Sequence, residues 1–187
     1  HLAGQSCDMK EIYELGVKYK FKIIEDAAHA IGGRYHNKNI GNCQYSDITV
    51  FSFHPVKIIT TGEGGAAMTN NSELQAKMQL LRSHGITRDS NKMSTIDGPW
   101  YYEQIMLGYN YRMTDIQASL GISQLRRLDA YIQKRKEIAL WYTDQIQNSS
   151  ISSKFKVLEQ KNNRESSHHL FIIQSRVVGN NSDIHKQ

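Results

Sequence analysis

Residues 52–65 read SFHPVKIITTGEGG, and this stretch decides how the rest of the chain is interpreted. It carries one lysine, Lys57, between two apolar segments. The preceding residues 47–53 are rich in β-branched and aromatic side chains, which is typical of a strand, and the glycines that follow predict a tight turn. We therefore expect Lys57 to lie in a tightly turned loop at the end of a strand, where its amine is partly withdrawn from water.

A second apolar run, residues 21–25, is followed by the acid Asp26 in the segment IIEDAAH. Ligands of open α/β sheets bind beyond the carboxyl ends of strands, so we expect Asp26 and Lys57 at one edge of the sheet. This pair suits pyridoxal phosphate (PLP), because the amine can form a Schiff base and the carboxylate can keep the pyridine nitrogen protonated. Each residue also has a purely structural interpretation, Lys57 as a solvated loop residue and Asp26 as a cap of the next turn.

Further candidate side chains for the same site are Ser52, His29 and Asn110. The Ser52 hydroxyl can bind a phosphate, and His29 lies shortly after Asp26. Asn110 comes just before a helix that is expected to begin at Thr114, and a helix beginning suits an anion. Without a ligand, Ser52 would be an ordinary strand serine, His29 a polar turn residue and Asn110 part of a capped turn.

Composition and charge narrow the classes of function. The chain has 187 residues, of which 39% are hydrophobic and 22% charged, as in ordinary globular domains. Its formal net charge of +5 is compatible with an anionic ligand, but a solvated surface is the favoured interpretation. Lys and Arg are scattered and no RNA-binding or zinc-finger signature is present, so a non-catalytic basic module that binds nucleic acid is the weaker alternative. Cys7 and Cys43 form no CxxC pair, so we expect no metal site and a reducing, cytoplasmic environment. We also expect no membrane span, because every apolar run is too short.

Alternating helix and strand patterns predict an α/β fold with a mostly parallel sheet. Helices are expected over residues 8–19, 72–84 and 114–146, with Asp8, Ser72 and Thr114 as N-caps and a bend at Gly121. Strands are expected over residues 21–25, 47–53, 66–69, 155–158 and 169–178, with a loop or weak hairpin over 31–45 and a long loop over 88–106. The polar sequence near Gln147 predicts two domains, residues 1–146 and the beginning of a small α+β domain at residues 147–187.

Several segments taken together resemble the DegT/StrS-type sugar aminotransferases, a family of PLP-dependent enzymes of the fold-type I architecture. The matching segments extend from His1 to about Gln174: HLAGQSCDM, IIEDAAHAIGG, SDITVFSFHPVKIITTGEGGAAMTN, LRSHGITR, LGYNYRMTDIQASLGISQL and SSHHLFIIQ. The resemblance implies that residues 1–146 are part of the large PLP-binding domain. It also implies that the chain is an internal segment of a longer protein, without that protein's other phosphate-binding loop and the aromatic residue that stacks on the cofactor.

The same resemblance implies a role for each candidate residue. Lys57 would form the Schiff base with PLP and shuttle a proton, and it favours transamination because a dehydratase branch of the family has histidine there. Asp26 would pair with the pyridine nitrogen, His29 would stand near the ring oxygen and Ser52 would bind the phosphate. Asn110 would reach the cofactor phosphate of the neighbouring subunit, since active sites in this family form across a homodimer interface.

The substrates are likewise implied by the resemblance. Residues 99–117, PWYYEQIMLGYNYRMTDIQ, are most similar to the 4-aminotransferases of UDP-linked 4-keto-6-deoxy-N-acetyl sugars, above all those of pseudaminic acid synthesis, which serves polysaccharide biosynthesis. The amino group would come from an amino-acid donor, expected to be glutamate. Transfer to C3 of a dTDP-ketosugar is the alternative, because the quoted motifs do not separate the two reactions.

Overall fold

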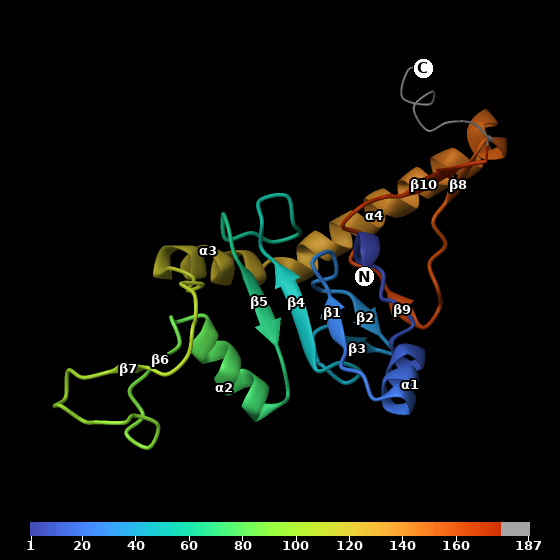
Figure 1. Cartoon of the computed structure of the whole chain (residues 1–187). Helices are drawn as coiled ribbons and strands as arrows, with labels where there is room; N and C mark the ends of the chain where they lie inside the picture. The colour runs from blue at the N-terminus through green and yellow to red at the C-terminus, as the bar shows by residue number, and fades with distance from the viewer. Residues whose placement is uncertain (177–187) are drawn as a thin grey trace.

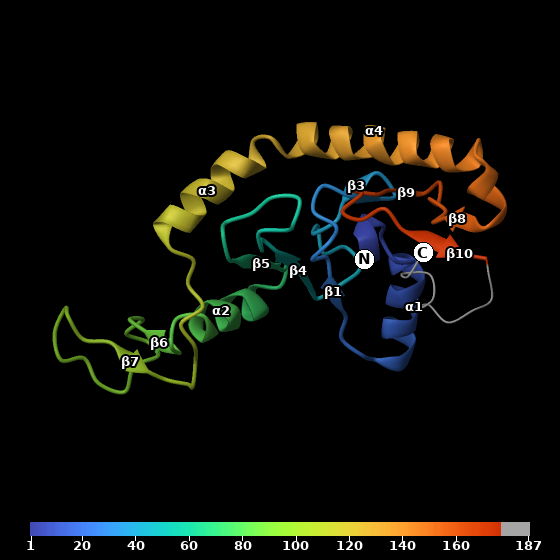
Figure 2. The ribbon, with the colours of Figure 1, turned by 90° about the horizontal axis from the view of Figure 1, so that it is seen from above.

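The computed structural model describes residues 1–176, which form an elongated α/β molecule (Figures 1 and 2). Its α-helices are α1 (Met9–Tyr19), α2 (Ser72–Leu81), α3 (Asp115–Leu125) and α4 (Leu128–Gln147). Its strands are β1 (Ile24–Asp26), β2 (Arg34–Tyr35), β3 (Lys38–Asn39), β4 (Ile48–Ser52), β5 (Gly65–Met68), β6 (Ile86–Thr87), β7 (Glu103–Gln104), β8 (Phe155–Val157), β9 (Arg164–Glu165) and β10 (Ile173–Ser175). Short 3-10 helices lie at η1 (Leu2–Gly4) and η2 (Ser150–Ser153). Figure 2 shows α3 and α4 along one side of the strands.

The central sheet has the strand order β1–β4–β5. β1 and β4 are parallel, with Asp26 opposite Val50, so both strands end at the same edge. β5 is antiparallel to β4, with Ser52 opposite Gly65. The sheet is therefore mixed and small, not mostly parallel as predicted. The physical reason is that the chain between β4 and β5 reverses direction in a compact loop, which Phe53 N closes by donating to Gly64 O at 2.8 Å, and such a reversal leads to an antiparallel neighbour.

The predicted helices are confirmed, with differences at their ends. α1 follows Asp8 as expected, but the Asp8 carboxylate binds Lys161 and Arg164 instead of a helix N–H. α2 is capped by Asn71, whose side-chain oxygen accepts hydrogen bonds from two backbone N–H groups, and not by the predicted Ser72. Asn71 is the better cap because its own extended backbone leaves the side chain free to reach the first turn.

The long helix predicted over residues 114–146 is two helices. α3 begins at the predicted N-cap Thr114, which forms a capping box with Gln117. The break lies at Arg126 and Arg127, and not at Gly121 as predicted. Gly121 lies inside α3, where a Cβ atom would come within 2.8 Å of Thr61 Cγ2. Glycine at this position therefore lets α3 approach the loop of Lys57.

The predicted strands are found at shifted or shorter spans. The strand predicted over residues 21–25 begins at Ile24, as β1. Of the strand predicted over residues 169–178, β10 forms the part within the described chain, and residues 177 and 178 lie outside it. Residues 31–45 contain the hairpin of β2 and β3, whose turn places His36 and Asn37 at positive φ. β9 was not predicted, because its two residues form a strand only by pairing with β2.

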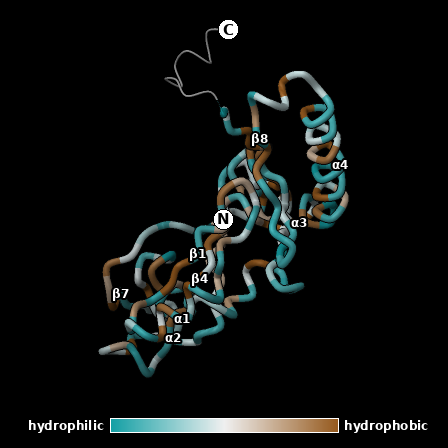
Figure 3. Tube along the Cα trace, turned by 90° about the vertical axis from the view of Figure 1, so that its right-hand side faces the viewer, coloured by the Kyte–Doolittle hydropathy of each residue, from teal (hydrophilic) through white to brown (hydrophobic). Residues whose placement is uncertain are grey.

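The core is small and surrounds the central sheet. One cluster contains Met9, Ile23 and Tyr35, and a second contains Ala27, Ala30 and Phe51. Figure 3 shows further apolar segments, in brown, on α4, where several large side chains are exposed: Ile138, Leu140 and Trp141. Within residues 1–176, no helix has the length and apolar character needed to cross a bilayer.

Three segments that lie far apart in the sequence meet beside the central sheet: residues 3–4, 27–30 and 166–169. Ser167 N donates to Gly4 O at 3.1 Å, and Ser167 Oγ donates to His29 O at 2.8 Å. His169 N donates to Ala3 O at 2.9 Å. Gly4 has φ +105°, and a Cβ atom there would lie only 2.9 Å from His168 N. The three segments can therefore approach this closely only with glycine at position 4.

We expect Gly4→Ala to lower the free energy of unfolding by about 2–4 kcal/mol, because the new methyl group strains the backbone and overlaps the segment of residues 167–168. The matched control is Gly62→Ala. Gly62 also has positive φ, +81°, but no atom lies within 4 Å of a Cβ there, so only the strain of about 1–2 kcal/mol is expected. Urea unfolding of both variants measures the difference. An equal loss of unfolding free energy in the two variants would show that close packing at Gly4 contributes nothing to stability.

Candidate active site

The loop between β4 and β5 holds Lys57 by its backbone. Lys57 N donates to His54 O at 2.9 Å, and Thr61 N donates to Phe53 O at 3.0 Å, which turns the chain back on itself. Ile58 and Ile59 follow directly and are buried at 6% and 3% exposure, so they anchor the loop to the protein. Lys57 itself is half-buried. Its amine thus stands on a fixed loop at the carboxyl edge of the sheet.

The helix α3 supports the glycine turn that follows Lys57. Gln117 Nε2 donates to Glu63 O at 3.1 Å. A Cβ atom on Gly64 would lie 2.9 Å from Met113 Cε, so the turn packs closely against the entry to α3. The GEGG sequence therefore has a packing role, and Gln117 and Met113 hold the end of the Lys57 loop against the entry to α3.

Asp26 and Ser52 end the neighbouring parallel strands β1 and β4, and because Asp26 is opposite Val50, Ser52 lies two residues further along β4 on the same face. Asp26 is exposed, and its Oδ1 accepts a hydrogen bond from Ala28 N at 3.0 Å. It therefore does cap the next turn, and its Oδ2 makes no hydrogen bond within residues 1–176. Ser52 Oγ accepts from His54 N at 3.4 Å, which leaves the hydroxyl proton to be donated.

His29 and His169 pack against each other, with ring centroids 4.5 Å apart and an angle of 42° between the planes. Burial and the positive charge of Lys57 lower the pKa of His29, and Asp26 opposes them. Burial, followed by the charges of His29, Lys57 and Arg135, lowers the pKa of His169 to about 4. Both rings are therefore neutral at pH 7. Because the charge of Lys57 affects the pKa of each ring, both histidines lie near Lys57.

Sequence reasoning missed His169. Its only signal was the pair of histidines directly before the apolar segment LFIIQ, which lies far from Lys57 along the chain. The structure brings it to the site through the hydrogen bond of its N–H to Ala3 O. Arg135 of α4 fixes the same segment, because its Nη1 donates to the carbonyl oxygens of His168 and His169, each at 3.3 Å.

Asn110 lies apart from the other predicted site residues. It forms a β-bridge with Ser83, next to the end of α2. Its neighbours Tyr109 and Tyr111 are exposed, and their rings stack with centroids 4.9 Å apart. No hydrogen bond in the described part of the chain joins Asn110 to another predicted site residue, so its place in this site stays a prediction.

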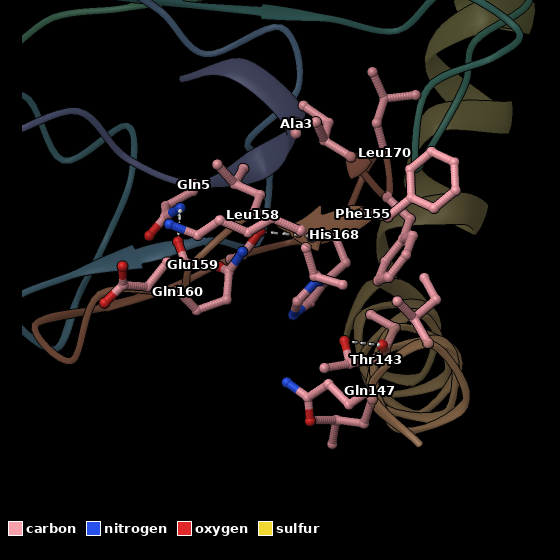
Figure 4. A pocket seen from close by; sticks show the side chains of 18 of the residues that line it. Ala3, Gln5, Thr143, Gln147, Phe155, Leu158, Glu159, Gln160, His168 and Leu170 are labelled. Atoms are coloured by element: carbon pink, nitrogen blue, oxygen red, sulfur yellow. Dashed lines mark hydrogen bonds between the residues drawn. The ribbon is translucent and has the colours of Figure 1, made fainter. Parts of the chain in front are cut away.

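A separate cavity of about 580 Å³ lies between α4 and the β8–β10 ladder (Figure 4). Its lining is mainly apolar and includes Leu140, Phe155 and Phe171, with His168 at its wall. None of the predicted site residues lines it. The cavity is therefore a space between a helix and a strand ladder, distinct from the Lys57 site.

The residues around Lys57 fit PLP. The structure supplies an amine on a fixed loop, a carboxylate with one uncommitted oxygen and a hydroxyl with a proton to donate, all at one sheet edge. The neutral ring of His29 stands beside them. Nδ1 of His169 is the one buried side-chain nitrogen or oxygen among residues 1–176 that lacks a hydrogen-bond partner. Such an unmade bond is costly in a buried place, so this nitrogen is an unusual feature of the segment beside Lys57.

The low pKa of His169 predicts a pH dependence of stability. The pKa is about 4 in the folded chain against 6.5 as the ordinary value, so between these values the unfolded chain binds more protons. The contribution of His169 to the free energy of unfolding therefore falls as the pH drops from about 6.5 to 4. We expect His169→Phe to reduce this fall, while the smaller contributions of His29 and His168, which have the same sign, persist. Urea unfolding of the wild type and of His169→Phe at pH 7 and pH 5 measures this fall. If the free energy of unfolding falls equally in the two proteins, the buried, neutral state of His169 is contradicted.

Comparison with known proteins identifies the family of the chain. The family model of the DegT/DnrJ/EryC1/StrS aminotransferases matches residues 1–185. A UDP-4-amino-4,6-dideoxy-N-acetyl-beta-L-altrosamine transaminase from Campylobacter jejuni is 43% identical over 170 residues, which are 91% of this chain and 42% of that protein. This chain thus spans about two fifths of that relative's length.

Solved structures show the same likeness. Helicobacter pylori PseC, an aminotransferase involved in the biosynthesis of pseudaminic acid, superposes with a TM-score of 0.82 at 36% identity, over 94% of this chain and 44% of that one. The PLP form of Spr1654 from Streptococcus pneumoniae superposes with a TM-score of 0.79 at 32% identity, over 94% of this chain and 46% of the other. By its sequence and its fold, the chain belongs to the DegT/DnrJ/EryC1/StrS aminotransferase family, whose members use PLP.

Proposed function

We propose that the intact protein is a PLP-dependent aminotransferase that converts a 4-keto-6-deoxy nucleotide sugar into the 4-amino sugar. The observation that carries this proposal is the placement of Asp26 at the end of β1 and of Lys57 in the loop that follows its parallel neighbour β4. Bound PLP would supply an electron sink and a carrier for the amino group. The remaining chemistry is that of the side chains, which bind, orient and move protons.

Asp26, Ser52 and His29 would hold the cofactor. Because Ala28 N fixes Oδ1 of Asp26, the carboxylate can offer Oδ2 to a protonated ring nitrogen without losing the turn. Ser52 would donate its hydroxyl proton to the phosphate. His29 accepts a hydrogen bond from Ala3 N on Nδ1 at 3.3 Å, so its neutral ring carries the proton on Nε2 and can donate to an oxygen.

Lys57 would serve twice. Its Nζ is the nucleophile that attaches the cofactor, and once released it can accept a proton and return it at another carbon. The buried anchors Ile58 and Ile59 keep the loop from moving during both steps. A lysine, and not a histidine, at this position favours amino transfer over dehydration.

For the substrate, we propose a UDP-linked N-acetyl 4-keto sugar, with glutamate as the amino donor. The support is the name of the 43% identical relative and the similarity to PseC. Transfer to C3 of a dTDP-ketosugar is the second candidate, because the residues around Lys57 would serve either position of the ketone.

We also propose a homodimer with shared sites. The surface around Asn110 exposes large apolar side chains, whose exposed fractions are 79% for Leu107, 73% for Tyr111 and 84% for Ile116. An exposed apolar patch of this kind is typical of a surface that binds another protein surface. Asn110 lies within it, as expected of a residue that serves the site of a second copy.

A panel of ketosugar nucleotides tests the proposal. The intact protein would be incubated with PLP, glutamate and UDP-linked 4-keto, GDP-linked 4-keto or dTDP-linked 3-keto sugars, and 2-oxoglutarate would be measured. We expect the highest kcat/KM for the UDP-linked 4-keto N-acetyl sugar. A higher value for the dTDP-linked 3-keto sugar would select the second candidate, and no amination of any sugar would contradict the proposal.

A further inference from the structure

His169 has no role in the function proposed above, yet the structure holds its ring in place from several sides. Its backbone N–H binds Ala3 O at 2.9 Å, and its carbonyl oxygen accepts a hydrogen bond from Arg135. Its ring packs on that of His29. A ring that is positioned this tightly beside the Lys57 site is available for contact with a ligand.

The hydrogen-bond pattern fixes where each neutral ring carries its proton. Nδ1 of His29 accepts from Ala3 N, so the proton of His29 is on Nε2. Nδ1 of His169 is buried without a partner in the described residues, and a buried N–H without a partner is rarer than a buried acceptor without one. His169 therefore also carries its proton on Nε2. The two adjacent rings share one tautomer, and each has one N–H to donate.

The surroundings favour an anionic oxygen as the acceptor. Burial first and the charge of Lys57 second lower the pKa of His29, against an opposing effect of Asp26. Burial, followed by the charges of His29, Lys57 and Arg135, lowers the pKa of His169, so both imidazoles are neutral. A positive potential combined with neutral N–H donors attracts an anion and leaves the donors in their required protonation state across the physiological range.

We propose that His169 is a binding residue of the Lys57 site, where its Nε2–H, beside that of His29, donates a hydrogen bond to an anionic oxygen of the ligand. The proposal rests on the proposed function. The oxygen belongs either to the ring of PLP or to the carboxylate of the amino donor, since both present the same chemistry to the pair of donors.

Three variants of the intact protein separate the donor from the ring. His169→Gln keeps an N–H close to the place of Nε2, His169→Asn moves the amide to the place of Nδ1, and His169→Phe keeps a packed ring without nitrogen. Loss of one hydrogen bond corresponds to a change of roughly 3- to 10-fold. We expect the Phe and Asn variants to weaken binding by this factor and the Gln variant to stay within about twofold of wild type.

Two readouts identify the source of the oxygen. A rise in the Kd of PLP with an unchanged KM for glutamate assigns it to the cofactor, and the reverse assigns it to the donor. Wild-type values for the Phe variant, or equal losses for Phe and Gln, would overturn the proposal. Thermal unfolding of each variant checks that the fold is retained.

A measurement without activity completes the test. In protein labelled with ¹⁵N-histidine, the ring signals of His169 are expected to show the Nε2–H tautomer and to stay constant between pH 8 and pH 5.5, with His29, Lys57 and Arg135 as the charges around it. An Nδ1–H tautomer would overturn the proposal even if the protein binds PLP. A wild-type protein that shows the expected tautomer but binds no PLP would overturn the proposed function instead, and with it the role of His169.

Discussion

Replacing Lys57 by alanine is expected to lower turnover of the intact protein by on the order of 10³-fold or more, because one side chain supplies both the nucleophile and the proton carrier. The fold should be unaffected, since the Lys57 side chain makes no hydrogen bond or ion pair within residues 1–176 and its loop is held by backbone bonds and by Ile58 and Ile59. Initial rates with glutamate and the ketosugar measure the loss.

The matched control for this prediction is Lys57→Arg. Arginine keeps a positive charge near His29 and His169, but its guanidinium stays protonated and cannot act as a nucleophile. We expect the Arg variant to be as inactive as the Ala variant, with histidine pKa values closer to those of wild type. Turnover of either variant within tenfold of wild type would contradict the role of Lys57.

Asp26→Asn is expected to lower kcat by about 10- to 150-fold, which corresponds to the loss of a hydrogen bond to a charged group. Asparagine can still accept from Ala28 N through its own oxygen, so the turn is kept. The amide cannot hold a ring nitrogen in the protonated form, so the electron-accepting ability of the ring declines while binding changes less.

Steady-state kinetics and a PLP titration separate these two effects of Asp26→Asn. Asp129→Asn, which changes an exposed acid of α4, is the control for the loss of one negative charge and should leave kcat unchanged. A kcat for Asp26→Asn equal to that of the control would mean that Asp26 only caps its turn.

Short-range patterns predicted the parts of the site that short segments build. Asp26 and Ser52 each end an apolar run, and the carboxyl ends of parallel strands lie at the same edge of a sheet, so their placement at one edge could be predicted from the sequence. The capping box at Thr114 is likewise a local arrangement, because the Gln117 side chain reaches the Thr114 backbone within one helical turn, independently of distant contacts. These features needed no information from distant residues.

The features that were missed depend on contacts between distant segments. β9 exists because β2 offers it a partner, and His169 reaches the site because Gly4 admits the segment of residues 166–169. The helix break at Arg126 and Arg127 contains no glycine or proline from which it could have been predicted. Gly121 resembled a bend but is a point of close approach to Thr61, which only the packed structure reveals. The boundary predicted at residue 147 remains a prediction, although β9 and residues 166–169 pack on the first part of the chain.

The most direct test of the account is chemical trapping of the attached cofactor. The intact protein would be saturated with PLP, reduced with borohydride, digested and mapped by mass spectrometry. We predict one modified peptide, with the label on the lysine of SFHPVKIITTGEGG. A label on a different lysine, or no label on a protein that stays folded, would contradict the account.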